Sequence, residues 1–243
     1  MRSRGLPAGC IILVLGAMAA HGQGRWGKKP WQKWSKDDCS AMLQDSPWAK
    51  TWSEEGIVNT PIGQSSGGTG REQVPEVYYL VQFRSALPVR EAVVREAQFE
   101  NKYDKMDVEH KKVLDDSANS YLGRDYSNDI VIHLDYGSNV TEYDRQLRSY
   151  WQSIPPGVVP RETYLINANG KKVVPSKMEV ASGGENAIEF IFPRSSSDGD
   201  FIKPSEKTVA LQFMNPQIGT LAAQTAYVQF DPRKMVVGGK TDY

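Results

Sequence analysis

Two segments with the period-2 alternation of β-strands flank two segments with helical periodicity in the middle of the chain. The strands are expected at Val77–Arg84 and Ile130–Tyr136, where alternate residues are apolar. The helices between them are expected to begin at Pro88 and after Asp107, which has the character of an N-cap. The pattern therefore predicts a strand–helix–helix–strand unit, which a short helix over Thr141–Ile154 follows.

The second helix of this unit carries the clearest amphipathic pattern. Six residues recur at helical spacings, which places them on one face that we expect to be buried. They are His110, Val113, Leu114, Ala118, Tyr121 and Leu122. His110 lies at the end of this stripe, so we interpret it as a core or boundary residue.

After Pro155 the pattern predicts β-strands only. Asn169-Gly170, between two β-rich segments, is the strongest hairpin signal in the chain. Turn residues separate short strand candidates at the spacing of an antiparallel β-sandwich of about seven strands. The candidates are Thr163–Ala168, Lys171–Val174, Lys177–Ala181, Ala187–Phe192, Thr208–Met214, Ala226–Phe230 and Lys234–Val237. The expected fold class is α+β, and residues 155–243 could share a sheet with residues 76–154.

The N-terminus has the three-part pattern of a secretory signal peptide. Arg2 and Arg4 precede an apolar run from Cys10 to Ala20, and small residues follow it. This run is too short to span a bilayer, which needs about 20 apolar residues. We expect residues 1–22 to be cleaved off, with an uncleaved anchor as the less favoured alternative. No later segment has the length and hydropathy of a transmembrane span.

Residues 23–53 begin with a basic, Trp-rich arm and continue as two short helices. Ser35 and Asp38 have the spacing of a capping box at the start of the first helix. A second helical turn is expected to begin at Pro47, because proline is favoured at the first helical position. Residues 54–75 are rich in Gly, Ser and Thr, so we expect a linker or a long surface loop.

Charge and cysteine content narrow the classes of protein. The 29 basic and 29 acidic residues balance, which argues against a nucleic-acid-binding protein. Cleavage of the signal peptide would leave Cys39 alone, so no internal disulfide could form. Cys39 shares an apolar stripe with Met42 and Leu43. We therefore interpret it as a buried structural thiol, ahead of an intermolecular disulfide and of a catalytic role.

The segments KWSKDDCSAMLQDSPWAKTW, YYLVQFRSALPVREAVVREAQ and KMVVGGK support a resemblance. In these segments the chain is similar to a group of uncharacterised exported proteins from acidobacterial genomes. The similarity covers most of the chain after the signal peptide. It implies a bacterial envelope or secreted setting and no particular activity.

Residues with catalytic or metal-binding chemistry are few, and no known catalytic motif is present. His133 and Asp135 lie together on the polar face of an expected strand, where they could act in base catalysis or bind a metal. A solvated polar face is the favoured interpretation. Asp198 and Asp200 are weak candidates for a metal site, and an acidic turn is favoured there. We expect no cofactor.

The arm before Ser35 is the strongest candidate for binding. Basic side chains alternate there with tryptophans, which suits an anionic envelope polymer or a membrane surface. The candidate binding residues are Trp26, Lys28, Lys29 and Lys33, and Trp26 is expected to be exposed. The remaining tryptophans of this region are expected to pack into the core of the protein; they are Trp31, Trp34, Trp48 and Trp52.

The sequence thus favours an exported, periplasmic or secreted, non-enzymatic binding or structural module of the bacterial cell envelope. Its partner would be an anionic polymer, a membrane surface or another envelope protein. The alternative is a hydrolase that acts on an envelope polymer. That alternative requires His133, Asp135 and the loop of Asp198 and Asp200 to meet in one cleft.

Overall fold

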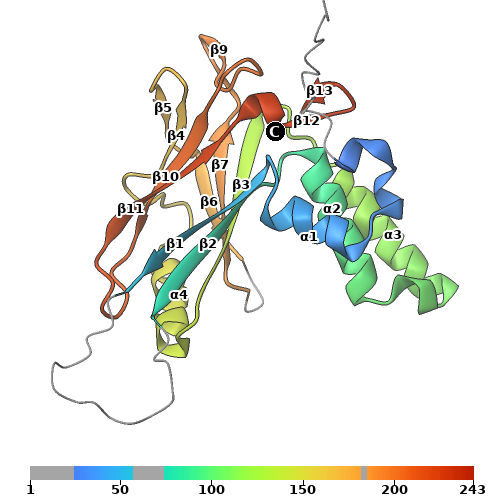
Figure 1. Ribbon diagram of the computed structural model, residues 1–243, viewed down its shortest axis with the longest axis horizontal. Helices are drawn as coiled ribbons and strands as arrows, with labels where there is room; N and C mark the ends of the chain where they lie inside the picture. The colour runs from blue at the N-terminus through green and yellow to red at the C-terminus, as the bar shows by residue number, and fades with distance from the viewer. Residues whose placement is uncertain (1–24, 57–73, 182–184) are drawn as a thin grey trace, which may run out of the picture.

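A computed structural model describes residues 25–56, 74–181 and 185–243. Within these ranges the protein is a mixed fold of α-helices and antiparallel sheets, as the expected α+β class requires (Figure 1). The signal peptide predicted for residues 1–22 and most of the linker predicted for residues 54–75 lie outside the described residues. Among the helices that are described, none is long and apolar enough to cross a membrane.

The larger sheet, sheet A, has five antiparallel strands in the order β1–β2–β3–β7–β6. The strands are β1 (Ala49–Glu55), β2 (Glu76–Phe83), β3 (Asp129–Ser138), β7 (Ala187–Pro193) and β6 (Lys177–Val180). Strand β3 pairs with β7, with Ile132 opposite Phe190. Sheet A therefore combines strands from both sides of residue 155.

The smaller sheet, sheet B, has four strands in the order β11–β10–β4–β5. They are β11 (Gln224–Phe230), β10 (Val209–Asn215), β4 (Tyr164–Asn167) and β5 (Lys172–Val173). Gly170 has φ +74° in the turn between β4 and β5, so the hairpin predicted at Asn169-Gly170 is confirmed. Two short hairpins complete the strands: β8 (Ser195–Ser196) with β9 (Gly199–Asp200), and β12 (Val236–Val237) with β13 (Lys240–Thr241).

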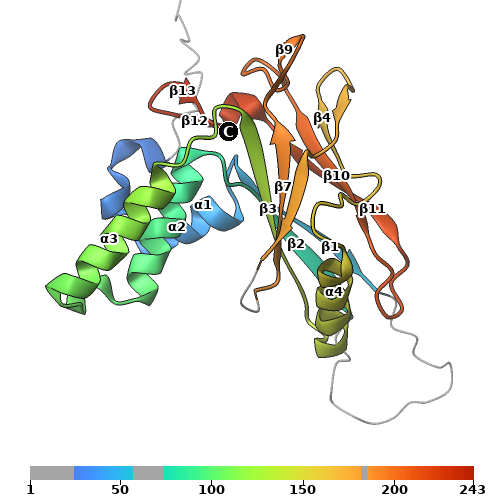
Figure 2. The same cartoon turned by 180° about the vertical axis from the view of Figure 1, so that it is seen from behind.

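The described residues form four α-helices beside the sheets. They are α1 (Lys36–Gln44), α2 (Leu87–Glu100), α3 (Val108–Leu122) and α4 (Thr141–Ser153). Four 3-10 turns accompany them: η1 (Arg25–Lys28), η2 (Trp31–Lys33), η3 (Tyr103–Lys105) and η4 (Pro232–Lys234). Helices α1, α2 and α3 gather on one side of the sheets, and α4 lies apart from them at the other end (Figures 1 and 2).

Aromatic side chains connect the two sheets. Tyr79 of β2 meets Phe213 of β10 edge to face, with 4.9 Å between ring centroids. Phe83 of β2 meets Phe230 of β11 at the same separation. Trp151 of α4 is fully buried beside both Tyr79 and Phe213. These ring contacts join residues of sheets A and B in one hydrophobic core, and α4 is anchored to it by its tryptophan.

The helical turn predicted after Pro47 is wrong, because this segment forms the strand β1. All seven residues of β1 pair with β2, with Trp52 opposite Tyr79. The proline and the helical spacing of Trp48 and Trp52 indicated a helix, but backbone pairing with a long neighbouring strand outweighs such local signals.

The stripe predicted for the helix after Asp107 is confirmed only in part. Asp107 caps α3, and Leu114, Ala118, Tyr121 and Leu122 are half-buried, but no residue of α3 is fully buried and Val113 is 66% exposed. The side chain of His110 is exposed and contacts the Asp107 carboxylate rather than the core. The helix is held by α2 instead: Arg90 donates to the carbonyl oxygen of Leu122 at 2.6 Å. The hydrophobic pattern of the sequence cannot predict a polar contact of this kind.

Candidate functional site

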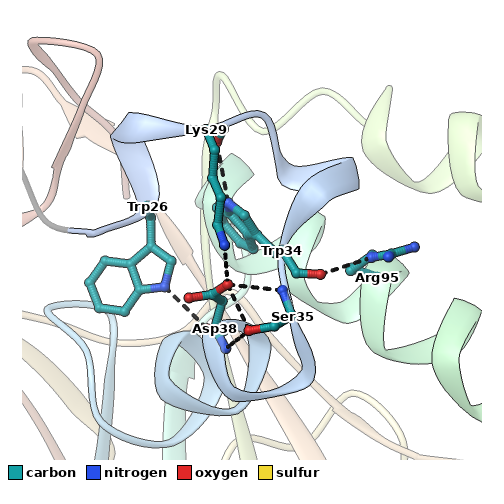
Figure 3. Close-up of polar contacts among 6 residues, drawn as sticks. All are labelled: Trp26, Lys29, Trp34, Ser35, Asp38 and Arg95. Atoms are coloured by element: carbon teal, nitrogen blue, oxygen red, sulfur yellow. Dashed lines mark hydrogen bonds and ion pairs between the residues drawn. The ribbon is translucent and has the colours of Figure 1, made fainter.

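The basic, Trp-rich arm folds back onto α1 and α2 rather than extending into solvent (Figure 3). Trp34 is only 2% exposed, and its indole N–H donates to the carbonyl oxygen of Lys29 at 3.3 Å. The guanidinium of Arg95 on α2 donates to the carbonyl oxygen of Trp34 at 3.2 Å. The end of the arm is therefore part of the folded domain.

Asp38 is the centre of this docking contact. Its carboxylate accepts hydrogen bonds from the backbone N–H and the hydroxyl of Ser35, at 2.9 and 2.8 Å. The ammonium group of Lys29 lies 2.6 Å from the same carboxylate oxygen. The predicted capping box is confirmed, since Ser35 Oγ also accepts from the backbone N–H of Asp38. Lys29, a predicted binding residue, is thus already paired with a carboxylate of the same chain, although its side chain is 39% exposed.

Trp26 is partly buried, so the expectation that it is exposed is wrong. Its indole N–H donates to the carbonyl oxygen of Asp38 at 3.1 Å, and its ring meets Trp48 edge to face at 6.3 Å. These two contacts fix the orientation of the ring. The glycines next to Trp26 in the sequence indicated a disordered segment, but the indole of Trp26 contacts both a polar and an aromatic partner.

The other arm residues divide between core and solvent. Trp34 and Trp48 belong to the core, as expected, and Trp31 and Trp52 are partly buried against it. Lys28 and Lys33, the remaining predicted binding residues, are exposed.

A cleft of about 470 Å³ opens beside Trp26. It lies where the arm, the start of β1 and the adjoining ends of β10 and β11 come together. Its lining residues come from five separate stretches of the chain: Trp26, Asp45–Pro47 and Lys50, Lys207–Thr208, Gln229–Asp231, and Lys234.

The charges of this cleft favour an anion. Asp45 is paired with Lys50 at 2.8 Å, and Asp231 accepts from Arg233 at 2.8 Å. These hydrogen bonds hold the pKa of both carboxyl groups below its ordinary value, so both are ionised and neutralised. Lys207 and Lys234 are exposed and have no ion pair or hydrogen-bonding partner for their ammonium groups among the described residues.

One polar atom in the wall of the cleft lacks a partner. The hydroxyl of Thr208 is buried and makes no hydrogen bond with any described residue. Buried hydroxyls are normally paired, so this one is an exception, but its oxygen is not accessible from the cleft and supports no ligand contact.

His133 lies in a second polar cluster, on the outer face of sheet A. Its side chain is 13% exposed and lies between two carboxylates. Nε2 is 3.0 Å from Asp135, and Nδ1 is 3.1 Å from Glu189 on the neighbouring strand β7. The predicted shared face of His133 and Asp135 is thus correct, but the favoured interpretation as a solvated face is wrong for the imidazole.

Two carboxylates flank the imidazole of this cluster. Burial would lower the pKa of His133, but its hydrogen bonds to Asp135 and Glu189 outweigh burial and raise that pKa above its ordinary value. Because each ring nitrogen lies against a carboxylate, neither is directed at open space where it could meet a metal or a substrate. Among the described residues, no group of three or more His, Cys, Asp or Glu side chains is arranged to hold a metal ion.

Asp198 and Asp200 do not join this cluster. They lie exposed in the β8–β9 hairpin, where Gly199 has φ +93°. Asp198 pairs with Lys171 at 2.6 Å, and Asp200 accepts from the hydroxyl of Ser195 at 2.7 Å. The pair is an acidic turn, which was the favoured interpretation.

Cys39 is buried among the apolar residues of α1, as predicted, with 1% of its surface exposed. Burial, with a smaller contribution from the nearby carboxylate of Glu96, raises the pKa of its thiol to about 11. A protonated thiol without access to solvent is a structural residue.

No family model, no curated protein and no solved structure matches this chain. Sequence reasoning identified Trp26 but missed Lys207 and Lys234, which carry no local signal and join the cleft only through the pairing of the strands.

Proposed function

We propose that the chain is a non-enzymatic binding module that a bacterium exports to its envelope, and that the cleft beside Trp26 holds an anionic polysaccharide. The observation that carries the proposal is a fixed indole ring at the same cleft as two exposed lysines, Lys207 and Lys234. An indole offers a large apolar face to a sugar ring, and ammonium groups pair with its carboxylate or phosphate substituents. The pattern of residues 1–22 supports export.

We also infer that sheets A and B form a β-sandwich, with β2, α2, α3 and β3 as its strand–helix–helix–strand unit. The ring contacts between Tyr79 and Phe213 and between Phe83 and Phe230 support this arrangement. In such a fold, ligands are usually bound by the edges of the sheets and by the connecting segments, and the cleft lies at such an edge.

The alternative function, hydrolysis of an envelope polymer, has less support. It needs an acid and a base or nucleophile gathered in one cleft. His133 already uses both ring nitrogens, and Asp198 and Asp200 contact other residues. Nothing in the described part of the chain favours hydrolysis over binding.

The proposal is tested by calorimetric titration of the chain from residue 23 onward with polygalacturonate, a polymer of uronates, and with neutral dextran. Polygalacturonate should bind and dextran should not. The double variant Lys207→Glu/Lys234→Glu should bind polygalacturonate at least about tenfold more weakly, since two charge-assisted contacts are replaced by repulsion. Lys102→Glu/Lys105→Glu, an equal double reversal at exposed lysines in and beside the turn η3, is the matched control and should bind as the wild type does.

Further titrations identify the chemistry that is recognised. Polyphosphate in place of polygalacturonate distinguishes phosphate from carboxylate recognition, and added NaCl should weaken either interaction. Equal affinity of the wild type and the double variant would contradict the proposal. Binding to anionic vesicles without binding to either polymer would assign the cleft to a membrane surface instead.

A further inference from the structure

Strand β6 forms one edge of sheet A, and half of its backbone groups point away from the sheet. The backbone N–H of Ala181 donates to the carbonyl oxygen of Ala187, so odd-numbered residues of β6 bond to β7. The backbone N–H and C=O of Met178 and Val180 therefore face outward. Among the described residues, nothing forms a hydrogen bond with these groups.

A groove of about 460 Å³ runs along this edge. One wall is β6 itself, and the other is the segment after α4, from Ile154 to Gly157. Pro155, Pro156 and the following Val158 are exposed, and Val158 is 47% accessible. Unpaired backbone groups beside exposed apolar surface are the usual ingredients of a site that accepts another strand.

The charged side chains of β6 determine which partner strand can pair with this edge. Lys177 and Glu179 lie on the outer face of sheet A and pair with each other. A lysine alone would discourage pairing at an edge. A lysine and a glutamate two residues apart can instead pair with the same two residues of a second, antiparallel copy, because each lysine then lies opposite a glutamate.

Antiparallel pairing of two copies of β6 can centre on Met178, Glu179 or Val180. In the register centred on Glu179, this residue lies opposite Glu179 of the second copy, and the like charges repel. In the register centred on Val180, Glu179 lies opposite Ala181 and gains no charged partner. In the register centred on Met178, this residue lies opposite Met178 of the second copy. Each Lys177 then lies opposite a Glu179, which gives two opposite-charge pairs across one two-fold axis.

We infer that β6 is a self-association surface, through which a second copy of this chain extends sheet A in the register centred on Met178. The two five-stranded sheets then form one continuous sheet, and the exposed prolines beside β6 are covered. Strand β1, the other edge of sheet A, lies beside β11 and the Trp26 cleft. The surface is thus separate from the proposed binding site, and the dimer carries two clefts.

Sedimentation equilibrium of the wild type and of charge-reversed variants tests this inference. The wild type should form dimers as its concentration rises. Lys177→Glu alone and Glu179→Lys alone should each weaken dimerisation at least about tenfold, because two attractive cross-strand pairs become repulsive. The double exchange Lys177→Glu/Glu179→Lys should restore it. Lys105→Glu is the matched control for a change of net charge.

Mixing the two single variants separates contacts between copies from contacts within one copy. An equimolar mixture of Lys177→Glu and Glu179→Lys places glutamates opposite lysines, so heterodimers should form although neither variant pairs with itself. Thermal melts of each variant establish that it is folded. A wild type that stays monomeric at all concentrations, or a mixture that stays monomeric while the double exchange dimerises, would overturn the inference. Capture of an unrelated extended peptide by a monomeric wild type would likewise replace it.

Discussion

The thiol of Cys39 is held protonated by its surroundings. Burial and the nearby carboxylate of Glu96 raise its pKa to about 11. The thiolate is the nucleophile that attacks a disulfide reagent, so such a reagent at mildly alkaline pH should label the native protein far more slowly than the urea-unfolded chain. The absorbance of the released reagent measures both rates. Equal rates would show that Cys39 is accessible and would contradict its structural role.

His133 should make stability depend on pH. Its folded pKa is raised above 6.5, so its contribution is complete below pH 6.5 and is lost as the pH rises through the raised value. Burial alone would raise the pKa of Asp135, but its hydrogen bond to His133 lowers it. The hydrogen bond to His133 also lowers the pKa of Glu189, against the opposite effect of burial. The contribution of both carboxylates is therefore lost in acid. The cluster therefore stabilises the fold most between pH 4.5 and 6.5.

Replacement of His133 by glutamine tests this window. Urea unfolding of His133→Gln should show a loss of about 2 kcal/mol between these pH values, because a charge-assisted contact is removed. The loss should shrink at alkaline pH, where the wild-type imidazole has also lost its charge. A difference that is independent of pH would show that His133 is neutral in the folded protein.

At the scale of single residues, the sequence could predict features that depend on residues close to one another in the chain. Alternation along β3 places His133 and Asp135 on one face, and helical spacing buries Cys39. The third member of the cluster, Glu189, lies 56 residues beyond His133 and joins it only through strand pairing. The lysines of the cleft, Lys207 and Lys234, are unpredictable for the same reason.

At the scale of elements, the arm is a docked part of the domain rather than a tail. Trp34→Ala should lower the free energy of unfolding by about 3–5 kcal/mol, as expected for removal of a buried tryptophan. Trp26→Ala should lower it by less, because Trp26 is only partly buried. Urea unfolding followed by circular dichroism measures both values.

The order of these two losses is what matters. A larger loss for Trp26→Ala than for Trp34→Ala would contradict the described docking of the arm. Deletion of the whole arm is a poor test of binding, because it removes Trp34 and the contact of Lys29 with Asp38 together with any surface residue.

The helix ends and turns that the sequence predicted correctly are those that depend only on their own residues. The capping box of α1, the cap of α3 and the hairpin at Gly170 are local features, and all three are present. The strand β1 and the position of α3 depend on residues outside these elements. Strand β1 pairs with β2, and Arg90 of α2 forms a hydrogen bond with the end of α3. Helical spacing cannot reveal either neighbour.

At the scale of the whole molecule, the strand positions after Pro155 were predictable, but the allocation of strands to sheets was not. All seven predicted segments contain strands, yet β6 and β7 pair with the earlier strands rather than with sheet B. Periodicity identifies a strand without naming its partner. The cleft beside Trp26 follows from this allocation, because its walls come from five separated stretches of the chain.

The most direct test of the account is a nuclear magnetic resonance titration of the indole N–H signals with a short oligogalacturonate. If the cleft binds an anionic sugar, the signal of Trp26 should shift in a saturable way, while that of Trp151, the buried tryptophan of α4, should stay in place. The shift of Trp26 should disappear in Lys207→Glu/Lys234→Glu. An unchanged Trp26 signal at saturating oligogalacturonate would contradict the proposed function.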